Sequence, residues 1–240
     1  MNLTFLGTGA AVSPDAYNAA ILVDRTILLD AGAPLSVHLP KAGLSLDEPR
    51  AVFLTHFHAD HTFGLAWLIL GRILMHEQAA PLTIFGPPGT RAHVTQLMEL
   101  AWGPEMLHTA MERRQMQVEE IAPGQDFHAE GYRVRAYPMV HAHRFSCFGY
   151  LLTRTGVRLG YTGDAEMSAE LEALIAASDH TIVEMTYEMP GPMHLSKPEV
   201  ESLISRHPGV RFILTHRGTR ATIKGAVAAH DFLTLRLPLR

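Results

Sequence analysis

Short apolar segments that end at Gly, Pro or Asp recur along the chain, and they constrain the fold more strongly than any other feature. Ala19–Val23 and Thr26–Asp30 flank Asp24-Arg25, which is the pattern of two strands joined by a tight turn. Ala51–Leu54 is a continuous apolar run that ends at a polar cluster, as is typical of a buried strand. The first part of the chain therefore combines a hairpin with a buried strand.

The same alternation continues to the end of the chain. The other predicted strands are Asn2–Leu6, Thr83–Phe85, Tyr132–Met139, Phe148–Thr153, Val157–Thr162, Thr181–Glu184, Arg211–Leu214 and Phe232–Leu237. Helical spacing predicts helices over Gly64–Met75, Arg91–Trp102 and Ala169–Ala177. The capping-box pattern Ser196-Lys197-Pro198-Glu199 opens a further helix. No low-complexity linker divides the two halves, so we expect a single domain over residues 1–240.

Composition excludes several classes of protein. Hydrophobic residues make up 47% and charged residues 18%, which is the globular range, and the single cysteine Cys147 excludes an intrachain disulfide framework. The N-terminus lacks a basic segment ahead of an apolar one, and the most apolar stretch, Phe63–Met75, is too short to cross a bilayer. We expect a cytoplasmic protein without a membrane partner. The net charge of −4 argues against a large nucleic-acid footprint.

Histidine is the unusual residue, because 15 of the 240 residues are histidine and three of these lie within six positions. In an extended segment that leaves a strand, side chains at i and i+2 point the same way, so His56 and His58 can converge on one ion. Asp60 and His61 follow where the chain turns into the next helix, and they can face a second ion. A lone surface histidine is seldom a ligand, but four such side chains directly after a buried strand predict a metal site.

Two ions need more ligands than this cluster supplies. His141, Asp164 and His216 each lie just past a predicted strand, where a rigid sheet commonly holds functional loops. An aspartate has two oxygens and can bridge two ions, although Asp164 after Gly163 also fits an ordinary turn. His143 is a rival to His141. The histidines without a strand-end context, which we interpret as surface or core residues, are His38, His76, His93, His108, His128, His180, His207 and His230.

Taken together, these residues resemble the metallo-β-lactamase superfamily over nearly the whole chain. The motifs that occur in the family's order are Gly7-Thr8-Gly9, Leu28-Leu29-Asp30-Ala31-Gly32, the histidine cluster, Gly163-Asp164 and Thr215-His216. The resemblance implies an α+β fold, a four-layer αββα sandwich of two mixed β-sheets flanked by helices. The observed mixture of hairpins and strand–helix units agrees with this fold.

The resemblance also implies a role for each candidate ligand. The implied ligands are His56, His58 and His141 for a first ion, Asp60, His61 and His216 for a second ion, and Asp164 as the bridge. Asp30 would support the site from behind without binding metal. Position 58 is histidine, where oxygen-reducing di-iron relatives carry glutamate, so hydrolysis with two divalent ions, zinc or manganese, is favoured over redox chemistry.

Within the superfamily, the chain is most similar to the ribonuclease Z-like phosphodiesterase branch. The segments that carry this similarity are Glu184-Met185-Thr186-Tyr187, Met193-His194-Leu195-Ser196 and Leu214-Thr215-His216. In that branch the histidine before the Ser or Thr helps the departing alkoxide, which makes His194 the expected general acid. The alternative is a capping-region histidine beside Ser196. Asp60 is expected to orient the water that two metal ions activate.

One departure from this branch concerns the substrate. Ribonuclease Z carries a long arm that grips transfer RNA between the equivalents of His141 and Asp164. Only 22 residues (142–163) separate these two positions here, and two predicted strands fill them. Together with the negative net charge, this short connection makes transfer RNA a disfavoured substrate.

The sequence therefore predicts a binuclear metal-dependent phosphodiesterase acting on a small or cyclic phosphodiester. One alternative is a lactone, thioester or β-lactam hydrolase on the same ions, and a less favoured one is a ribonuclease Z-type RNA endonuclease. A metal-stabilised binding protein is the alternative from a different class, with every coordination position closed by protein. Family habit suggests a homodimer.

Overall fold

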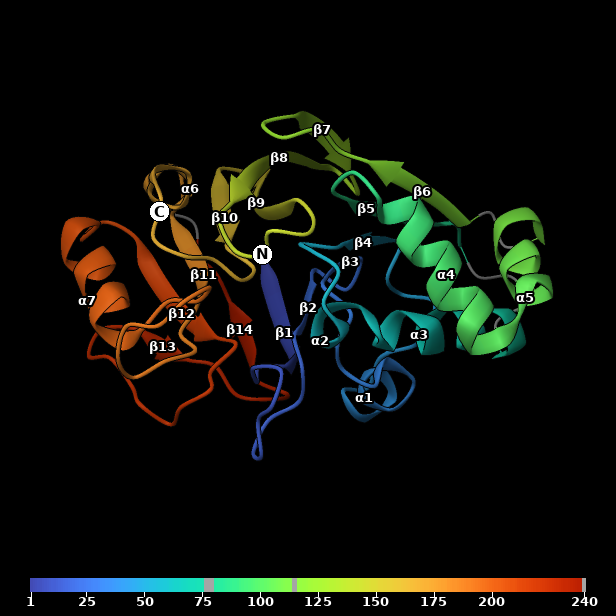
Figure 1. Cartoon of the computed structure of the whole chain (residues 1–240), viewed down its shortest axis with the longest axis horizontal. Coiled ribbons are helices and arrows are strands. Elements are labelled where there is room, and N and C mark those ends of the chain that lie inside the picture. Colours follow the sequence, from blue (N-terminus) through green and yellow to red (C-terminus); the bar gives the residue numbers. More distant parts are fainter. Residues whose placement is uncertain (76–79, 114–115, 239–240) are drawn as a thin grey trace.

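Two mixed β-sheets face each other in the computed structural model, which describes residues 1–75, 80–113 and 116–238. Within these residues, each sheet has seven strands, in the orders β14-β1-β2-β3-β4-β5-β6 and β13-β12-β11-β10-β9-β8-β7. Helices α3, α4 and α5 lie on one outer side, and α6 and α7 lie on the other (Figure 1). The predicted αββα sandwich is confirmed.

The element bounds are as follows. The strands of the first sheet are β1 (Asn2–Gly7), β2 (Ala20–Val23), β3 (Ile27–Leu29), β4 (Ala51–Phe53), β5 (Leu82–Gly86), β6 (Met116–Glu120) and β14 (Thr234–Arg236). The strands of the second sheet are β7 (Asp126–Ala129), β8 (Tyr132–Met139), β9 (Cys147–Arg154), β10 (Val157–Tyr161), β11 (His180–Glu184), β12 (Arg211–Thr215) and β13 (Val227–Ala228). The helices are α1 (Leu35–Lys41), α2 (Ala59–Thr62), α3 (Gly64–Met75), α4 (Thr90–Trp102), α5 (Pro104–His108), the π-helix η1 (Thr109–Arg113), α6 (Ala169–Ala176) and α7 (Lys197–Arg206).

Strand direction divides each sheet into an antiparallel and a parallel half. Strands β14, β1, β2 and β3 pair antiparallel, whereas β3 to β6 pair parallel. Strands β7 to β10 pair antiparallel, whereas β10 to β13 pair parallel. At the predicted tight turn, Asp24 and Arg25 have φ values of 44° and 65°, as a two-residue hairpin turn requires. Parallel neighbours need crossover connections, and α3, α6 and α7 supply three of them.

Three apolar clusters fill the spaces between the layers. In β2, Ile21 and Val23 belong to the cluster between the sheets, whereas Ala20 and Leu22 belong to the cluster under α1, α3 and α4. This division follows from the alternation of side chains along a strand. A third cluster lies between the second sheet and helices α6 and α7. Both faces of each sheet are therefore buried, which explains the continuous apolar runs in the sequence.

Helix α3 has the bounds that the sequence predicts, Gly64–Met75, and most of its residues are buried. Its one charged residue, Arg72, is buried and donates hydrogen bonds to the carbonyl groups of Leu46 and Pro49 at 3.0 and 2.9 Å. The charge that interrupts the apolar window is thus satisfied inside the protein. In the described part of the chain, no helix combines the length and the apolarity needed to span a bilayer.

The last strand is shorter than predicted. Phe232 lies in the left-handed region with φ of 65°, and the amide of Leu233 donates to the carbonyl of His230 in a turn. The strand therefore begins at Thr234 instead of Phe232. Capping of α7 is as predicted, because the Ser196 amide donates to the Glu199 carboxylate at 2.8 Å in a capping box.

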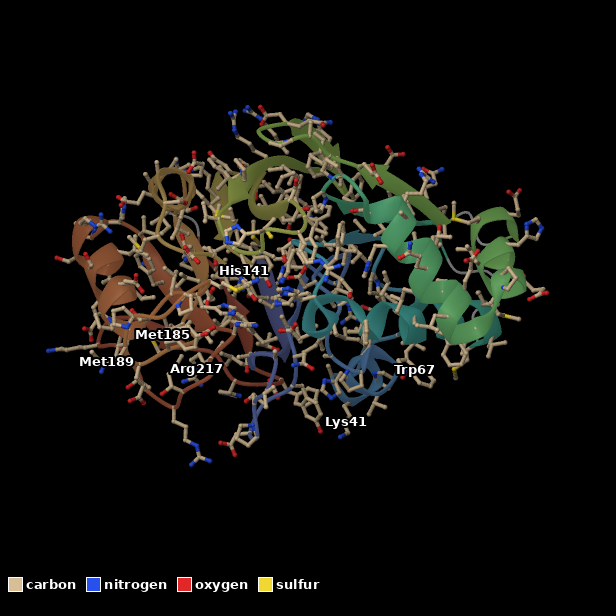
Figure 2. The ribbon with its side chains drawn as sticks, in the orientation of Figure 1. Lys41, Trp67, His141, Met185, Met189 and Arg217 are labelled. Carbon is tan, nitrogen blue, oxygen red and sulfur yellow. The ribbon has the colours of Figure 1, made fainter. Side chains whose placement is uncertain are left out.

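Strand direction brings the predicted ligands to one edge. Because β9 is antiparallel to both β8 and β10, these two strands run the same way, and β11 and β12 continue parallel to β10. The loops after β8, β10, β11 and β12 therefore leave the second sheet on the same side. In Figure 2, His141 lies between the two halves of the molecule.

Candidate metal site

The residues predicted to hold the first ion lie together in space. The ligand atoms of His56, His58, His141 and Asp164 are all within 4.8 Å of one another. Nε2 of His56 and Nε2 of His141 lie 3.0 and 3.2 Å from Nδ1 of His58. Ligands that bind a tetrahedral ion at about 2.0–2.1 Å lie about 3.3 Å from each other. The nitrogen spacing therefore fits a single ion.

The residues predicted to hold the second ion form an adjoining group. The ligand atoms of Asp60, His61, Asp164 and His216 also lie within 4.8 Å of one another. Nε2 of His216 is 3.1 Å from an oxygen of Asp60 and 3.5 Å from an oxygen of Asp164. Asp164 belongs to both groups, with one oxygen 3.3 Å from Nε2 of His61 and the other 3.8 Å from Nε2 of His56. This carboxylate lies where a bridging ligand would be needed.

Hydrogen bonds behind the site orient the imidazole rings. The Thr55 hydroxyl lies 2.9 Å from an Asp30 oxygen, so its single proton can go to that carboxylate while its oxygen accepts from Nδ1 of His56 at 3.0 Å. Nδ1 of His141 donates to the carbonyl of Met193 at 2.6 Å. In each ring this arrangement leaves Nε2 with its lone pair toward the centre of the site, which is the form that binds metal.

The second group shows the same arrangement. Nδ1 of His61 donates to Asp30 at 2.8 Å. The Thr186 hydroxyl can donate to Glu184 at 2.6 Å and accept from Nδ1 of His216 at 3.0 Å. These two outer contacts leave Nε2 of both rings available to an ion.

Two atoms at the centre of the site are buried and have no hydrogen-bond partner within the described part of the chain. They are Nε2 of His61 and one carboxylate oxygen of Asp164, and both residues are almost completely buried. Buried polar atoms normally have partners, so a facing pair without them needs an explanation. Imidazole nitrogen and carboxylate oxygen are the donors that zinc and similar divalent ions prefer. The residues present therefore fit a metal site.

Electrostatics keep four of the candidate ligands in their metal-binding forms, whereas the carboxylates of Asp164 and Asp30 raise the pKa of His61. Burial lowers the pKa of His56, His58 and His141, so these imidazoles are neutral near pH 7. Burial alone would raise the pKa of Asp60, but hydrogen bonds from His216 and His61 outweigh it and the pKa falls. Asp60 is therefore an anion at neutral pH.

Asp30 supports the site from behind, as the family resemblance implies. Its carboxylate is fully buried and accepts hydrogen bonds from the Thr55 amide at 2.8 Å, from His61 and from the Tyr161 hydroxyl at 2.7 Å. Its oxygens point to these donors and not to the centre of the site. One carboxylate thus fixes both the histidine-cluster loop and the His61 ring.

Gly163 allows the Asp164 loop to approach the histidine-cluster loop. Its φ is +57°, and a Cβ atom at this position would lie 2.8 Å from Cβ of Thr55. A larger residue would be strained in backbone conformation and would also collide with Thr55. The Gly-Asp pair is therefore needed for Asp164 to reach both ligand groups.

His194 is paired with a buried carboxylate at the margin of the site. Its Nδ1 lies 3.0 Å from an oxygen of Glu184, which is fully buried, and 3.8 Å from an oxygen of Asp164. Burial opposes the charged form, but the hydrogen bond and the negative charge of Glu184 outweigh it and raise the pKa of His194. A ring held in this way can carry a proton near neutral pH. Ser196, the N-cap residue of α7, makes its capping hydrogen bonds with Glu199, whereas His194 is bonded to Glu184, so the capping interpretation of His194 loses support.

Glu184 is the functional residue that sequence reasoning did not single out. It is the last residue of β11, and its other oxygen accepts from the Thr186 hydroxyl. It also accepts from the amide of Ala165 at 2.8 Å, next to Asp164. Because Glu184 lies inside the predicted strand and not just past it, the strand-end rule that selected His141, Asp164 and His216 does not select it.

The remaining histidines lie outside both ligand groups. His143, the rival to His141, is exposed. His38 is buried, and its Nδ1 is 2.6 Å from the carbonyl of Leu6. His180 is buried within β11. His76 lies outside the residues that the structure describes.

Comparison with known proteins agrees with this geometry. The family model described as Anti-Pycsar protein Apyc1 matches residues 1–225. A ribonuclease Z from Mycobacterium sp. (strain KMS) is 29% identical over 190 residues, which cover 74% of this chain and 66% of that relative. The chain thus spans just under two thirds of that relative's length.

Solved structures give the same fold. The short form of human tRNase Z superposes with a TM-score of 0.80 at 25% identity, covering 99% of this chain and 100% of that one. The metallo-β-lactamase fold protein YhfI from Bacillus subtilis gives a TM-score of 0.78 at 16% identity, covering 98% of each chain. The chain therefore belongs to the Anti-Pycsar protein Apyc1 family, within the ribonuclease Z-like branch of the metallo-β-lactamase superfamily.

Proposed function

We propose that this chain is a binuclear metal-dependent phosphodiesterase, a single-domain hydrolase whose substrate is a small or cyclic phosphodiester. The observation that carries the proposal is the position of His194, which is paired with Glu184. Nδ1 of His194 lies 3.8 Å from an oxygen of Asp164, the proposed shared ligand. A phosphodiester with an alkoxide leaving group needs a proton donor beside the metal ions, and His194 fits this role. Ribonuclease Z relatives, which by name act on RNA phosphodiesters, support the same bond type.

The ligand roles follow the two groups of donor atoms. The proposed ligands are His56, His58 and His141 for one ion, Asp60, His61 and His216 for the other, and Asp164 for both. When bound, two zinc or manganese ions supply an activated water near neutral pH and neutralise the charge that grows on the phosphate.

Protein side chains supply the remaining steps. Asp60 has one oxygen 3.1 Å from His216, and we assign its other oxygen to orient the attacking water. His194 donates a proton to the leaving oxygen, and Glu184 holds the His194 ring and favours its protonated form. Thr186 holds both Glu184 and His216, so the acid and one metal ligand are fixed by the same hydroxyl.

A small substrate is favoured over transfer RNA. The chain between His141 and Asp164 forms β9 and β10, which pair with each other inside the second sheet. Outside these strands the connection leaves only residues 142–146, 155–156 and 162–163, which are too few for a long protruding arm. The chain also has a net charge of −4. Binding a polyanion such as transfer RNA normally needs clustered Lys and Arg.

The test is an assay of the zinc- or manganese-loaded protein on cyclic nucleotides, aryl phosphodiesters, transfer RNA precursors, lactones and thioesters. We expect metal-dependent turnover of the small phosphodiesters that exceeds a His56→Ala control. Turnover of a lactone or thioester, without turnover of any phosphodiester, would instead indicate the alternative lactone or thioester hydrolase. Metal uptake without turnover of any of these substrates would favour a binding protein.

A further inference from the structure

A cavity of about 700 Å³ opens beside His58, on the side of the metal site that faces the start of α4. Three separate segments line it: the histidine-cluster loop, the beginning of α4, and the loop between β8 and β9 that also carries His141. Its volume is within the range of about 300–1,000 Å³ that is usual for small-molecule sites. Because His58 is both a cavity wall and a proposed ligand, a phosphate at the metal site can place an attached group in this cavity.

Aromatic rings form the walls next to His58. Phe57 and His93 are stacked with ring centroids 4.8 Å apart and an interplanar angle of 16°. Phe145 lies 5.4 Å from Phe57 and 5.2 Å from His58, and it meets the His58 ring edge-on. The rings thus form a continuous wall that begins at the metal site and extends to α4.

Core packing does not account for these rings. Phe57 and Phe63 belong to none of the three apolar clusters of the core, and Phe145 only contacts the edge of the third. Phe63 is 56% exposed and lines the same cavity, so it extends the apolar surface of these rings. Contiguous exposed apolar surface commonly marks a binding site.

The polar side chains that line the cavity are those of His58, His93, Gln96, Arg144 and Ser146. Nε2 of His93 is buried and has no hydrogen-bond partner among the described residues. Among the described residues that line the cavity there is no carboxylate, and Arg144 carries the one permanent positive charge. A single guanidinium can stack on a planar ring or contact its polar edge, but it is too little charge to hold several phosphates.

We propose that Phe57, His93 and Phe145 bind a planar aromatic or heteroaromatic ring carried by the substrate, with Arg144 at its edge. This inference rests on the proposed function, because the metal site would hold the phosphate of the same molecule. The ring wall then determines which phosphodiesters bind: diesters with a ring, such as a nucleobase, are preferred to diesters of simple alcohols. Phe145 and Phe57 act as specificity residues and not in the chemical step.

Isothermal titration of the zinc-loaded protein tests the inference without turnover. Each nucleoside 5′-monophosphate is compared with ribose 5-phosphate, which has the same phosphate and sugar but no ring, and with inorganic phosphate. Stacking of one base on an aromatic side chain corresponds to about 5- to 150-fold in affinity. We expect a preference in this range for the ring-bearing ligand, and equal affinity of all variants for inorganic phosphate.

Variants identify the residues responsible. Phe145→Leu and Phe57→Leu should each reduce the preference at least about fivefold, whereas Phe145→Tyr should keep it because the ring remains. Phe232→Leu is the matched control, since this ring packs on His38 and does not line the cavity. Thermal melting of each variant checks that the fold is intact.

Two results would overturn the inference: equal binding of ring-bearing and ring-free ligands by the parent protein, or an unchanged preference in both leucine variants. Neither result depends on the proposed activity. Absence of metal-dependent turnover on any phosphodiester would instead refute the proposed function, while the titration would still report whether the ring wall binds a ring.

Discussion

Replacement of His194 by glutamine separates a catalytic role from a structural one. The ring is mostly buried, with 17% of its side chain exposed, and Nδ1 donates to Glu184 at 3.0 Å. Alanine would leave the buried Glu184 carboxylate without this donor, which costs about 1–3 kcal/mol. The glutamine amide can donate to Glu184 instead, so His194→Gln removes the acid and retains the hydrogen bond.

The size of the effect depends on the leaving group. A 3′,5′-cyclic nucleotide releases an alkoxide, which needs a proton, and general acid catalysis contributes about 10²–10⁴-fold to such a step. Bis(p-nitrophenyl) phosphate releases a stabilised phenolate that leaves without one. We therefore expect kcat for the cyclic nucleotide to fall by about 10²–10⁴ and kcat for the aryl diester to fall by less than about tenfold.

The assay measures kcat and KM for both substrates with the same zinc-loaded preparations, and a melting curve excludes loss of fold. The control variant is Asp126→Asn on strand β7, because Asp126 does not line the cavity. Equal losses on both substrates would refute the reasoning. That result would mean that His194 maintains the site and does not protonate the leaving oxygen.

Three further predictions follow from the hydrogen bonds around the site. Glu184→Gln removes the anion that raises the pKa of His194, so the His194 ring loses its proton at a lower pH. The alkaline limb of the kcat/KM profile for alkyl diesters should therefore move to lower pH, and an unchanged profile would contradict this role of Glu184. Asp30→Asn replaces the carboxylate that accepts from Nδ1 of His61 by an amide, which is a weaker acceptor. Zinc affinity, measured by competition with a chelator, should fall by about 10–100-fold, whereas the surface variant Asp126→Asn should leave it unchanged. Removal of metal by a chelator should lower the melting temperature by about 5–10 °C if zinc was present at about 100 times its Kd, and addition of zinc should restore it; a melting temperature independent of zinc would argue against binding at this site.

Much of the fold and of the candidate site could be predicted from local patterns. Buried parallel strands are continuous apolar runs, so Ala51–Leu54, Val157–Thr162 and Arg211–Leu214 stand out, and each is confirmed as a strand to within one residue. Polar residues directly after such strands share one sheet edge. The structure accordingly brings His141, Asp164 and His216 to the histidine cluster; their binding of metal stays a prediction.

Edge elements were harder to predict, for physical reasons. Met116–Glu120 (β6) and Asp126–Ala129 (β7) lie at the edges of their sheets and alternate polar with apolar residues over only four or five positions. Helix α1 contains Pro40 and has no side-chain cap, so its sequence lacks the usual helix signals. Packing against the sheet stabilises these elements, and a local pattern does not encode that contact.

The ring wall could not be predicted because its members are distant in sequence. Phe57 and Phe145 come from two loops and His93 from the start of α4, and each alone is an ordinary aromatic residue. Glu184 was overlooked for a different reason: a single acid within an apolar strand has no meaning until its partner His194 is placed beside it.

The proposed ligands divide between the two sheets: the histidine-cluster loop leaves β4 of the first sheet, and His141, Asp164 and His216 leave the second. Ions bound by ligands from both sheets would link the two sheets at one edge of the sandwich, where polar side chains replace the apolar contacts between the sheets. The lifetime of the folded chain would then follow the zinc supply of the cell, since any ligand that binds only the native state slows its loss. Scarcity of the metal would reduce the amount of this protein as well as its turnover.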